Sequence, residues 1–370
     1  MFDTYRKYVP RRTVLGTAIW IAAAAFAGGS AMADDPVNTP TLGQQHDGYL
    51  AIDLIFATDR AKTESDEPGE HFGKDRGTLR FGTCRVSIPE AHQRGNIEDS
   101  NVFTRDKPRK HVLLLEKPAT LERPSFIEML SERVRRSPSR EVLLVVHGYN
   151  VTFEEAALRT AQVAYDIEFK GVPVIYSWPA QGNTLSYTVD QINAAWSRPH
   201  LVEFLQLLIE HAGATKIHLL GHSLGNRVLS DALVELVRGR AANLPPLFGQ
   251  IILAAPDIDS EIFARDAAAH LVKCSERVTI YASAKDRAIA GSRTLHRYPR
   301  LGEAGKQLTL FRDFERIEVI DATGARETML GHTYFSVSPR FLDDLQGVLT
   351  GKKPIDRDLC AEDGYWAFHR

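Results

Sequence analysis

The stretch from Gly221 to Gly225, GHSLG, carries a serine whose surroundings suit nucleophilic chemistry. Residues 215–220 before it predict a short buried strand, and residues 226–237 after it place apolar side chains on one helical face. A strand that turns sharply into a helix strains the backbone at its apex, and the flanking glycines remove the Cβ clashes that would block the turn. The helix would also aim unpaired N–H groups at the hydroxyl. We therefore expect Ser223 to be a nucleophile.

Ser223 needs a base, because a serine hydroxyl is a weak nucleophile until its proton is removed. In hydrolases that carry this turn, an acid and then a histidine follow the serine along the chain. Of the downstream histidines, His332 alone follows the last predicted strand and precedes the final predicted helix, and Gly331 gives its loop freedom. We expect His332 to be the base, with His296, in a loop before the last strand, as the alternative.

Two aspartates follow predicted strands beyond the serine. Asp286 comes after the strand 277–282, and Asp257 comes after the preceding strand, 249–255. The acid in such proteins most often follows the second strand after the nucleophile, which favours Asp286. Asp257 is the alternative acid, although it also suits a helix cap or an ion pair with an arginine, because residues 258–268 look helical.

The negative charge that develops on a substrate carbonyl needs hydrogen-bond donors, typically two rigid backbone amides. One would come from Leu224, directly after the serine. The other would come from the loop after the strand 141–146, where a His-Gly pair that begins at His147 resembles the oxyanion turn of lipases and esterases. This places the second donor at Tyr149, with the Asn150 side chain as the alternative. We expect His147 to brace the turn.

His222, next to the nucleophile, is expected to pack inside the turn.

The elements that must position these groups alternate from residue 124 onward. Apolar runs predict strands and the stretches between them predict helices, an alternation typical of parallel βαβ units with right-handed crossovers. The predicted strands beyond residue 124 are 141–147, 172–178, 215–220, 249–255, 277–282 and 316–321.

Ahead of this alternation, three strands are predicted in an N-terminal β-rich extension, at 49–58, 79–89 and 112–116. Charged, glycine-containing stretches between them predict loops. Residues 184–211 and 287–311 are expected either to form lips or a partial lid over the site or simply to cover the sheet.

The N-terminus resembles an export signal. Basic residues precede an apolar stretch at 13–27, and Ala31 to Ala33 offers a small-residue cleavage site. The pair Arg11 and Arg12 resembles a twin-arginine signal, while the ordinary secretory route stays open. The apolar stretch is shorter than the roughly 20 residues of a spanning helix. We therefore expect a periplasmic or secreted protein that keeps no membrane span after the signal is removed.

The composition narrows the choice of partners. A formal net charge of −2 leaves no basic surplus for a nucleic-acid backbone. The three cysteines, Cys84, Cys274 and Cys360, match no zinc spacing, and no H-E-x-x-H motif occurs, so neither a metal nor a cofactor is expected. In an oxidising compartment these cysteines form at most one intramolecular disulfide, and the sequence leaves its pairing open, as it does the oligomeric state.

Several motifs together resemble the DUF900 family of bacterial α/β-hydrolases, which is described only as esterase- or lipase-like. The resemblance spans roughly residues 50 to 346 and rests on 56–60 (FATDR), 81–89 (FGTCRVSIP), 146–150 (VHGYN), 176–179 (YSWP), 221–225, 255–257 (APD), 283–293 and 300–302. It implies an α/β-hydrolase fold, with a mostly parallel sheet and helices on both faces beside the N-terminal extension. It also implies serine hydrolase chemistry with Ser223, Asp286 and His332 as the triad, but no substrate.

These inferences predict an exported serine hydrolase that cleaves small or lipid-like carboxylic esters through an acyl-enzyme. A peptidase, thioesterase or acyltransferase with the same triad is an alternative, as is a non-catalytic envelope protein that uses the fold for binding or scaffolding. The expected division of the chain is an export signal, a mobile leader, the β-rich extension, the hydrolase domain and a C-terminal tail, at 1–33, 34–48, 49–123, 124–350 and 351–370.

Overall fold

The computed structural model describes residues 42–98, 107–182, 186–241, 243–325 and 331–369. The predicted export signal and most of the predicted leader lie outside these residues. None of the helices in the described ranges combines the length and the apolar character that crossing a membrane requires.

The continuous apolar runs form six central strands. Such runs are expected in a parallel sheet, because helices cover both of its faces. Each strand is parallel to its neighbours. In spatial order they are β7 (Val172–Ser177), β6 (Glu141–Val146), β8 (Lys216–His222), β9 (Phe248–Ala254), β10 (Ser275–Ala282) and β11 (Ile317–Asp321).

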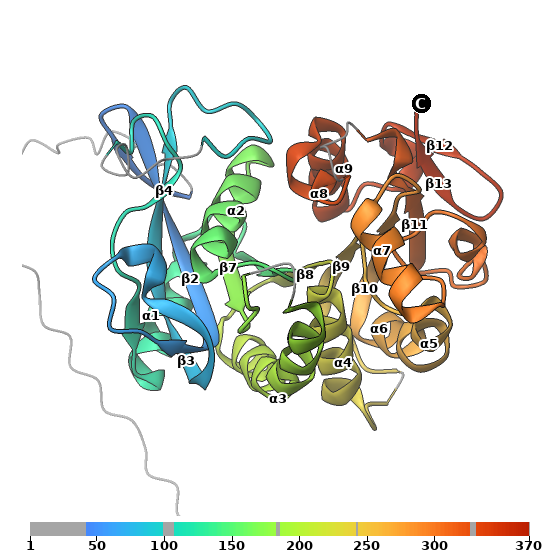
Figure 1. Ribbon diagram of the computed structural model, residues 1–370, viewed down its shortest axis with the longest axis horizontal. Helices are drawn as coiled ribbons and strands as arrows, with labels where there is room; N and C mark the ends of the chain where they lie inside the picture. The colour runs from blue at the N-terminus through green and yellow to red at the C-terminus, as the bar shows by residue number, and fades with distance from the viewer. Residues whose placement is uncertain (1–41, 99–106, 183–185, 242, 326–330, 370) are drawn as a thin grey trace, which may run out of the picture. The chain divides into compact units, whose positions relative to one another are not determined.

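The N-terminal strands continue this sheet at one edge (Figure 1). The long strand β2 (Tyr49–Lys62) lies parallel to β7, with Thr58 opposite Ser177, and antiparallel to β3 (Phe72–Pro89). Three short strands complete this edge: β1 (Gly43–His46), β4 (Leu113–Leu114) and β5 (Ala119–Leu121).

At the other edge, the segment predicted as a C-terminal tail contains β12 (Leu359–Ala361) and β13 (Trp366–Phe368), and β13 lies parallel to β11.

Helices cover both faces of the sheet, and alternate strand residues point to opposite faces. Leu144 packs with residues of α1 (Arg123–Arg136), α3 (Tyr187–His211), α4 (Gly225–Val237) and α6 (Ala268–Cys274). Its neighbour Leu143 packs on the other face, in the cluster that holds residues of α2 (Phe153–Asp166) and α9 (Pro339–Leu349). The remaining helices are α5 (Ser260–Ile262), α7 (Arg287–His296) and α8 (Tyr334–Val337). This is the predicted mostly parallel sheet with helices on both faces.

Candidate active site

Ser223 occupies a strained turn between β8, which ends at His222, and α4, which begins at Gly225. Its φ of 52° lies in the left-handed region, which a non-glycine residue adopts only when its surroundings hold it there. The Ser223 N–H donates to Ala254 O at 3.1 Å, and the Ser223 carbonyl accepts from Asp257 N at 3.2 Å. The fold therefore fixes the conformation that the sequence motif predicted.

Two glycines allow the serine turn and the loop after β6 to touch. A Cβ added at Gly225 would overlap the carbonyl oxygen of His147. A Cβ added at Gly148 would lie 2.8 Å from His222 Nδ1 and 2.9 Å from Ser223 Cβ. The loop that follows β6 thus lies directly against the serine.

His332 and Asp286 form a hydrogen-bonded pair. His332 Nδ1 lies 2.8 Å from Asp286 Oδ2 and 3.0 Å from Oδ1, and the Asp286 side chain is fully buried. Asp286 also caps α7, because its Oδ1 accepts from Ile289 N at 3.0 Å. With Nδ1–H facing a carboxylate, the other ring nitrogen, Nε2, is the acceptor, and no described residue bonds to it.

Ser223 and His332 line one cavity of about 240 Å³. Most of its wall comes from α7 and from two tyrosines, Tyr149 and Tyr187, whose rings meet edge to face at 5.4 Å. Within the described part of the chain, no hydrogen bond joins Ser223 to His332. A bond of this kind often tightens only in the complex with substrate.

The residues expected to donate to an oxyanion lie beside this cavity. Among the described residues, the Leu224 N–H has no hydrogen-bond acceptor, and Leu224 is fully buried. Tyr149 lines the cavity and follows Gly148, which lies against the serine. Asn150, whose side chain is the alternative donor, instead lines a neighbouring cavity of about 290 Å³, and its backbone N–H donates to Asp190 Oδ2 at 3.2 Å.

The alternative acid, Asp257, also lines this cavity, but its carboxylate is bonded to other side chains. Its Oδ1 accepts from Arg300 Nε at 2.7 Å and from Ser292 Oγ at 2.6 Å, and its Oδ2 accepts from Tyr187 OH at 2.5 Å. The structure therefore brings Asp286, and not Asp257, to His332. The alternative base, His296, ends α7 and bonds to Gln191 Nε2 at 2.8 Å.

Two further histidines near the serine have pKa values too low for them to take up a proton at neutral pH. Burial first, and then the charge of Arg60, lower the pKa of His147 to about 3. Burial also lowers the pKa of His222 well below its ordinary value, and the charge of His332 adds to this effect. His222 Nε2 donates to the carbonyl of His332 at 3.1 Å, so it supports the loop that carries the candidate base.

Sequence reasoning missed Arg60, which contacts the loop after β6. Arg60 lies in β2, is 1% exposed, and donates to Val151 O at 2.6 Å in the loop after β6. The available signal was the motif FATDR at 56–60, in which a charge pair interrupts an apolar strand.

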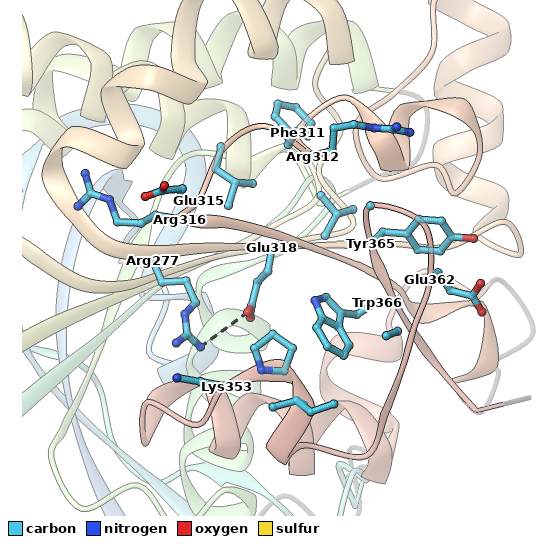
Figure 2. Close-up of a pocket in the computed structure, with 16 residues that line it drawn as sticks. Arg277, Phe311, Arg312, Glu315, Arg316, Glu318, Lys353, Glu362, Tyr365 and Trp366 are labelled. Atoms are coloured by element: carbon cyan, nitrogen blue, oxygen red, sulfur yellow. Dashed lines mark ion pairs between the residues drawn. The ribbon is translucent and has the colours of Figure 1, made fainter.

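Other features of the structure lie away from the serine. A larger cavity of about 520 Å³ lies near the start of β11, where Arg277 pairs with Glu318 at 3.7 Å beside Trp366 (Figure 2). None of the predicted site residues lines it. The described residues contain no cluster of three or more metal-ligating side chains, and all three cysteines are free.

The chain is similar to a protein family and to an individual relative. The model of a family described as "Alpha/beta hydrolase of unknown function (DUF900)" matches residues 122–349. An uncharacterized protein from Nostoc sp. is 24% identical over 157 residues, a stretch that covers 34% of this chain and 41% of that relative. The chain thus aligns with less than half the length of this curated relative.

The solved structures that match the chain have low sequence identity to it and low TM-scores. Esterase B from Lactobacillus Rhamnosis is 10% identical, with 80% of this chain and 84% of that chain covered and a TM-score of 0.36. A lipase-esterase related protein from Clostridium acetobutylicum is 9% identical, with 59% and 96% covered and a TM-score of 0.31. An acylaminoacyl peptidase from Pyrococcus horikoshii is 10% identical, with 86% and 43% covered and a TM-score of 0.38. Because the family model matches most of the chain, the protein belongs to the DUF900 family of α/β-hydrolases.

Proposed function

We propose that the protein is an exported serine hydrolase that cleaves carboxylic esters through an acyl-enzyme. One arrangement carries the proposal: Ser223, held at a φ of 52°, shares a cavity with His332, whose Nδ1 faces the buried carboxylate of Asp286. Acyl transfer by serine requires a nucleophile, a base that takes its proton and an acid that orients the base.

In the proposed reaction, Ser223 Oγ attacks the ester carbonyl carbon while His332 Nε2 takes the hydroxyl proton. Asp286 keeps the Nδ1 proton in place and stabilises the imidazolium that forms. The imidazolium then gives its proton to the departing alkoxide, which leaves the acyl group on the serine. Water, activated by the same histidine, releases the carboxylic acid and restores the free enzyme.

The negative charge on the carbonyl oxygen would be held by the backbone amides of Leu224 and Tyr149. Two observations support these donors. The Leu224 N–H has no acceptor among the described residues, and the backbone just before Tyr149 contacts the serine at Gly148. The α4 N-terminus beside Ser223 adds a partial positive charge.

The substrate proposed for this cavity is an ester with a small or medium apolar group. Ala288, Ile289 and Leu295 line the wall beside the two tyrosine rings. A volume of about 240 Å³ is below the roughly 300–1,000 Å³ of most ligand pockets, which favours a small or medium group. Exposed Leu295 would lie under any longer chain that leaves the cavity.

A fluorophosphonate probe tests the nucleophile, because it reacts with an activated serine. We expect labelling of the wild type and loss of labelling in Ser223→Ala. Ser131→Ala is the matched control, since Ser131 lies in α1 and its hydroxyl bonds to Glu128 O within that helix. Folded wild-type protein that takes up no label would favour a binding or scaffolding role.

A series of p-nitrophenyl esters tests the substrate class. Turnover should be greatest with short and medium acyl chains, and Ser223→Ala should abolish it. An enzyme that labels but cleaves only amides or thioesters would retain the triad and overturn the ester assignment.

Export of the protein from the cytoplasm is also a proposal. It rests on the basic residues and the apolar stretch at 13–27, followed by Ala31 to Ala33. Fractionation of a bacterial host followed by N-terminal sequencing should find the protein outside the cytoplasm, beginning at Asp34. Uncleaved protein in the cytoplasm would contradict export.

A further inference from the structure

Arg60 is a buried cation that donates mainly to backbone carbonyls. Its Nη1 donates to Gly73 O and Ala180 O, both at 3.1 Å, and its Nη2 donates to Val151 O at 2.6 Å. Its Nε donates to Ser177 Oγ at 2.9 Å. One side chain thus joins the β2–β3 hairpin to the segments that follow β6 and β7.

No carboxylate in the described residues pairs directly with this guanidinium. Burial lowers the pKa of Arg60 to about 10, and the charges of Asp59, Asp190 and Glu155 counteract that effect. The group therefore stays charged at neutral pH. Because a buried charge without a direct partner is costly, loop placement is a better account of Arg60 than ion-pair stability.

The same guanidinium reaches the histidine at the start of the loop after β6. Arg60 Nη2 lies 3.4 Å from His147 Nε2, and Ser177 Oγ lies 3.2 Å from the same nitrogen. His147 Nδ1 lies 2.8 Å from Gly148 O, and the ring stacks on Trp178 at 5.3 Å. These contacts hold both ends of the loop from His147 to Val151.

The middle of that loop carries the proposed oxyanion donor. Gly148 lies against Ser223, and Tyr149 follows it. A shift of a few tenths of an ångström would change the distance from the Tyr149 amide to the carbonyl oxygen that Ser223 attacks. Hydrogen bonds of this kind contribute only when the donors are held rigidly.

We propose that Arg60 is a positioning residue that fixes the loop 147–151 for oxyanion binding, so that the N-terminal strands are part of the catalytic unit. The inference rests on the proposed serine hydrolase function. It also means that activity depends on a residue outside 122–349, the segment that the family model matches.

The test compares Arg60→Met with Arg85→Met in the full chain. Arg85 lies on the same hairpin and pairs at the surface with Glu116 at 2.8 Å. We expect Arg60→Met to lower kcat by about 100-fold, the scale of losing one oxyanion donor, with KM changed by less than about threefold. Arg85→Met should match the wild type.

An arylboronic acid, which forms a tetrahedral adduct with serine, reports on the oxyanion donors directly. Its affinity should fall with kcat in Arg60→Met, because both depend on the placed amides. Arg60→Lys should recover part of the loss, since it keeps the charge but has fewer donors in a less fixed geometry. A purely structural role would lower thermal stability, but it would not lower kcat selectively while KM stays nearly unchanged.

If Arg60→Met does not fold, Arg60→Lys and Ser177→Ala decide the question. Ser177→Ala removes a contact of both Arg60 and His147, and we expect an intermediate loss of kcat and of boronic acid affinity. Folded variants with wild-type kcat and inhibitor affinity would overturn the role of Arg60. Wild-type protein that neither labels nor hydrolyses would instead overturn the proposed function itself.

Discussion

Both carboxylate oxygens of Asp286 lie within hydrogen-bond distance of His332 Nδ1, at 2.8 and 3.0 Å. The same carboxylate caps α7 through Ile289 N. The helix therefore holds the acid in place, and the acid selects the histidine tautomer whose Nε2 is free to accept a proton. Asp286 thus has two roles, selecting the tautomer of His332 and capping α7, and a substitution can affect the first without the second.

Asp286→Asn should lower kcat by about 10⁴-fold, because an amide can donate to Nδ1 and so favours the wrong tautomer. The amide oxygen can still cap α7, so the melting temperature should change little. Ester hydrolysis and thermal unfolding measure the two effects separately.

Asp257→Asn is the informative comparison for that variant. It weakens a buried pair with Arg300, so we expect a loss of stability of about 3 kcal/mol. It should leave the tautomer of His332 unchanged. If Asp257→Asn lost as much kcat as Asp286→Asn while still folded, the assignment of Asp286 as the acid would be wrong.

Gly225→Ala should damage the contact between the serine turn and the loop after β6. The added Cβ would overlap the carbonyl of His147, and such overpacking costs about 1–3 kcal/mol. Activity should fall with stability, because the two halves of the site are pushed apart. Chemical denaturation and ester hydrolysis measure the two losses.

Gly291→Ala serves as the control for stability alone, because Gly291 lines the cavity but its added Cβ would meet nothing within 4 Å. Alanine in helix α7 should stabilise the protein by about 0.5–1 kcal/mol. A Gly225→Ala variant as stable as Gly291→Ala and as active as the wild type would show that the close approach is unimportant.

The sequence could predict much of the parallel sheet, because continuous apolar runs mark strands covered on both faces. The predicted strand 277–282 lies within β10, and 316–321 nearly coincides with β11. The family and the α/β-hydrolase fold are confirmed by the matched family model. The catalytic roles of Ser223, Asp286 and His332 stay a prediction, although the structure brings the last two into contact.

The same reasoning failed where buried charges interrupt an apolar run. The strand predicted at 49–58 continues to Lys62 and includes Asp59 and Arg60, which are both buried. Local patterns assign such charges to loops, because the partners that accept them lie far along the chain. Ser177, for example, is 117 positions from Arg60. Hence sequence reasoning proposed the reacting groups but missed the arginine that contacts the loop beside them.

The three cysteines should differ in reactivity toward iodoacetamide. Burial raises the pKa of Cys84 and of Cys274 to about 12, which leaves little thiolate at neutral pH. Cys360 is partly exposed, and its Sγ lies 2.9 Å from His369 Nδ1. Mass spectrometry of the native protein should find one alkylated cysteine, Cys360, and three after unfolding. Rapid labelling of Cys84 in folded protein would contradict its burial.

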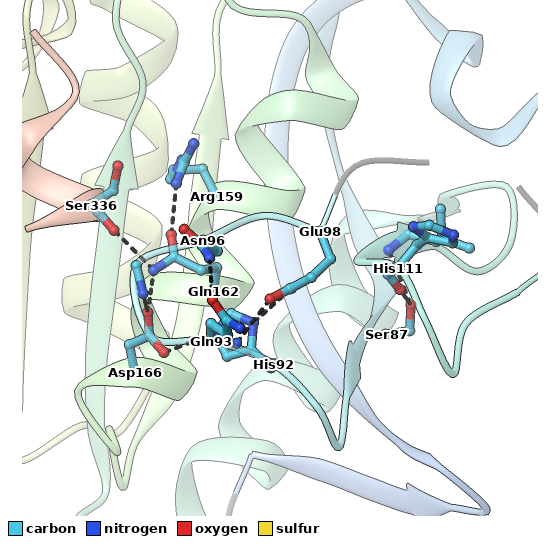
Figure 3. Close-up of polar contacts among 12 residues, drawn as sticks. Ser87, His92, Gln93, Asn96, Glu98, His111, Arg159, Gln162, Asp166 and Ser336 are labelled. Atoms are coloured by element: carbon cyan, nitrogen blue, oxygen red, sulfur yellow. Dashed lines mark hydrogen bonds and ion pairs between the residues drawn. The ribbon is translucent and has the colours of Figure 1, made fainter. Parts of the chain in front are cut away.

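The last prediction concerns a buried histidine between two carboxylates. His92 Nδ1 lies 2.8 Å from Glu98, and His92 Nε2 lies 3.0 Å from Asp166 (Figure 3). Asp166 also accepts from Gln162, whose amide donates to Ser336 O at 3.0 Å, shortly after His332. Burial opposes protonation, but the hydrogen bonds to the carboxylates outweigh it and raise the pKa of His92.

Only the protonated ring can donate to both carboxylates at once, so the stabilisation should depend on pH. Because the folded-state pKa lies above the unfolded value of about 6.5, this stabilisation is complete below about pH 6.5 and is lost as pH rises through the folded pKa. His92→Gln, which does not titrate, should therefore destabilise the protein more at about pH 6 than at about pH 8.5. Urea denaturation of both proteins at the two pH values measures the difference. An equal loss of stability at both values would mean that His92 is not protonated between its carboxylates.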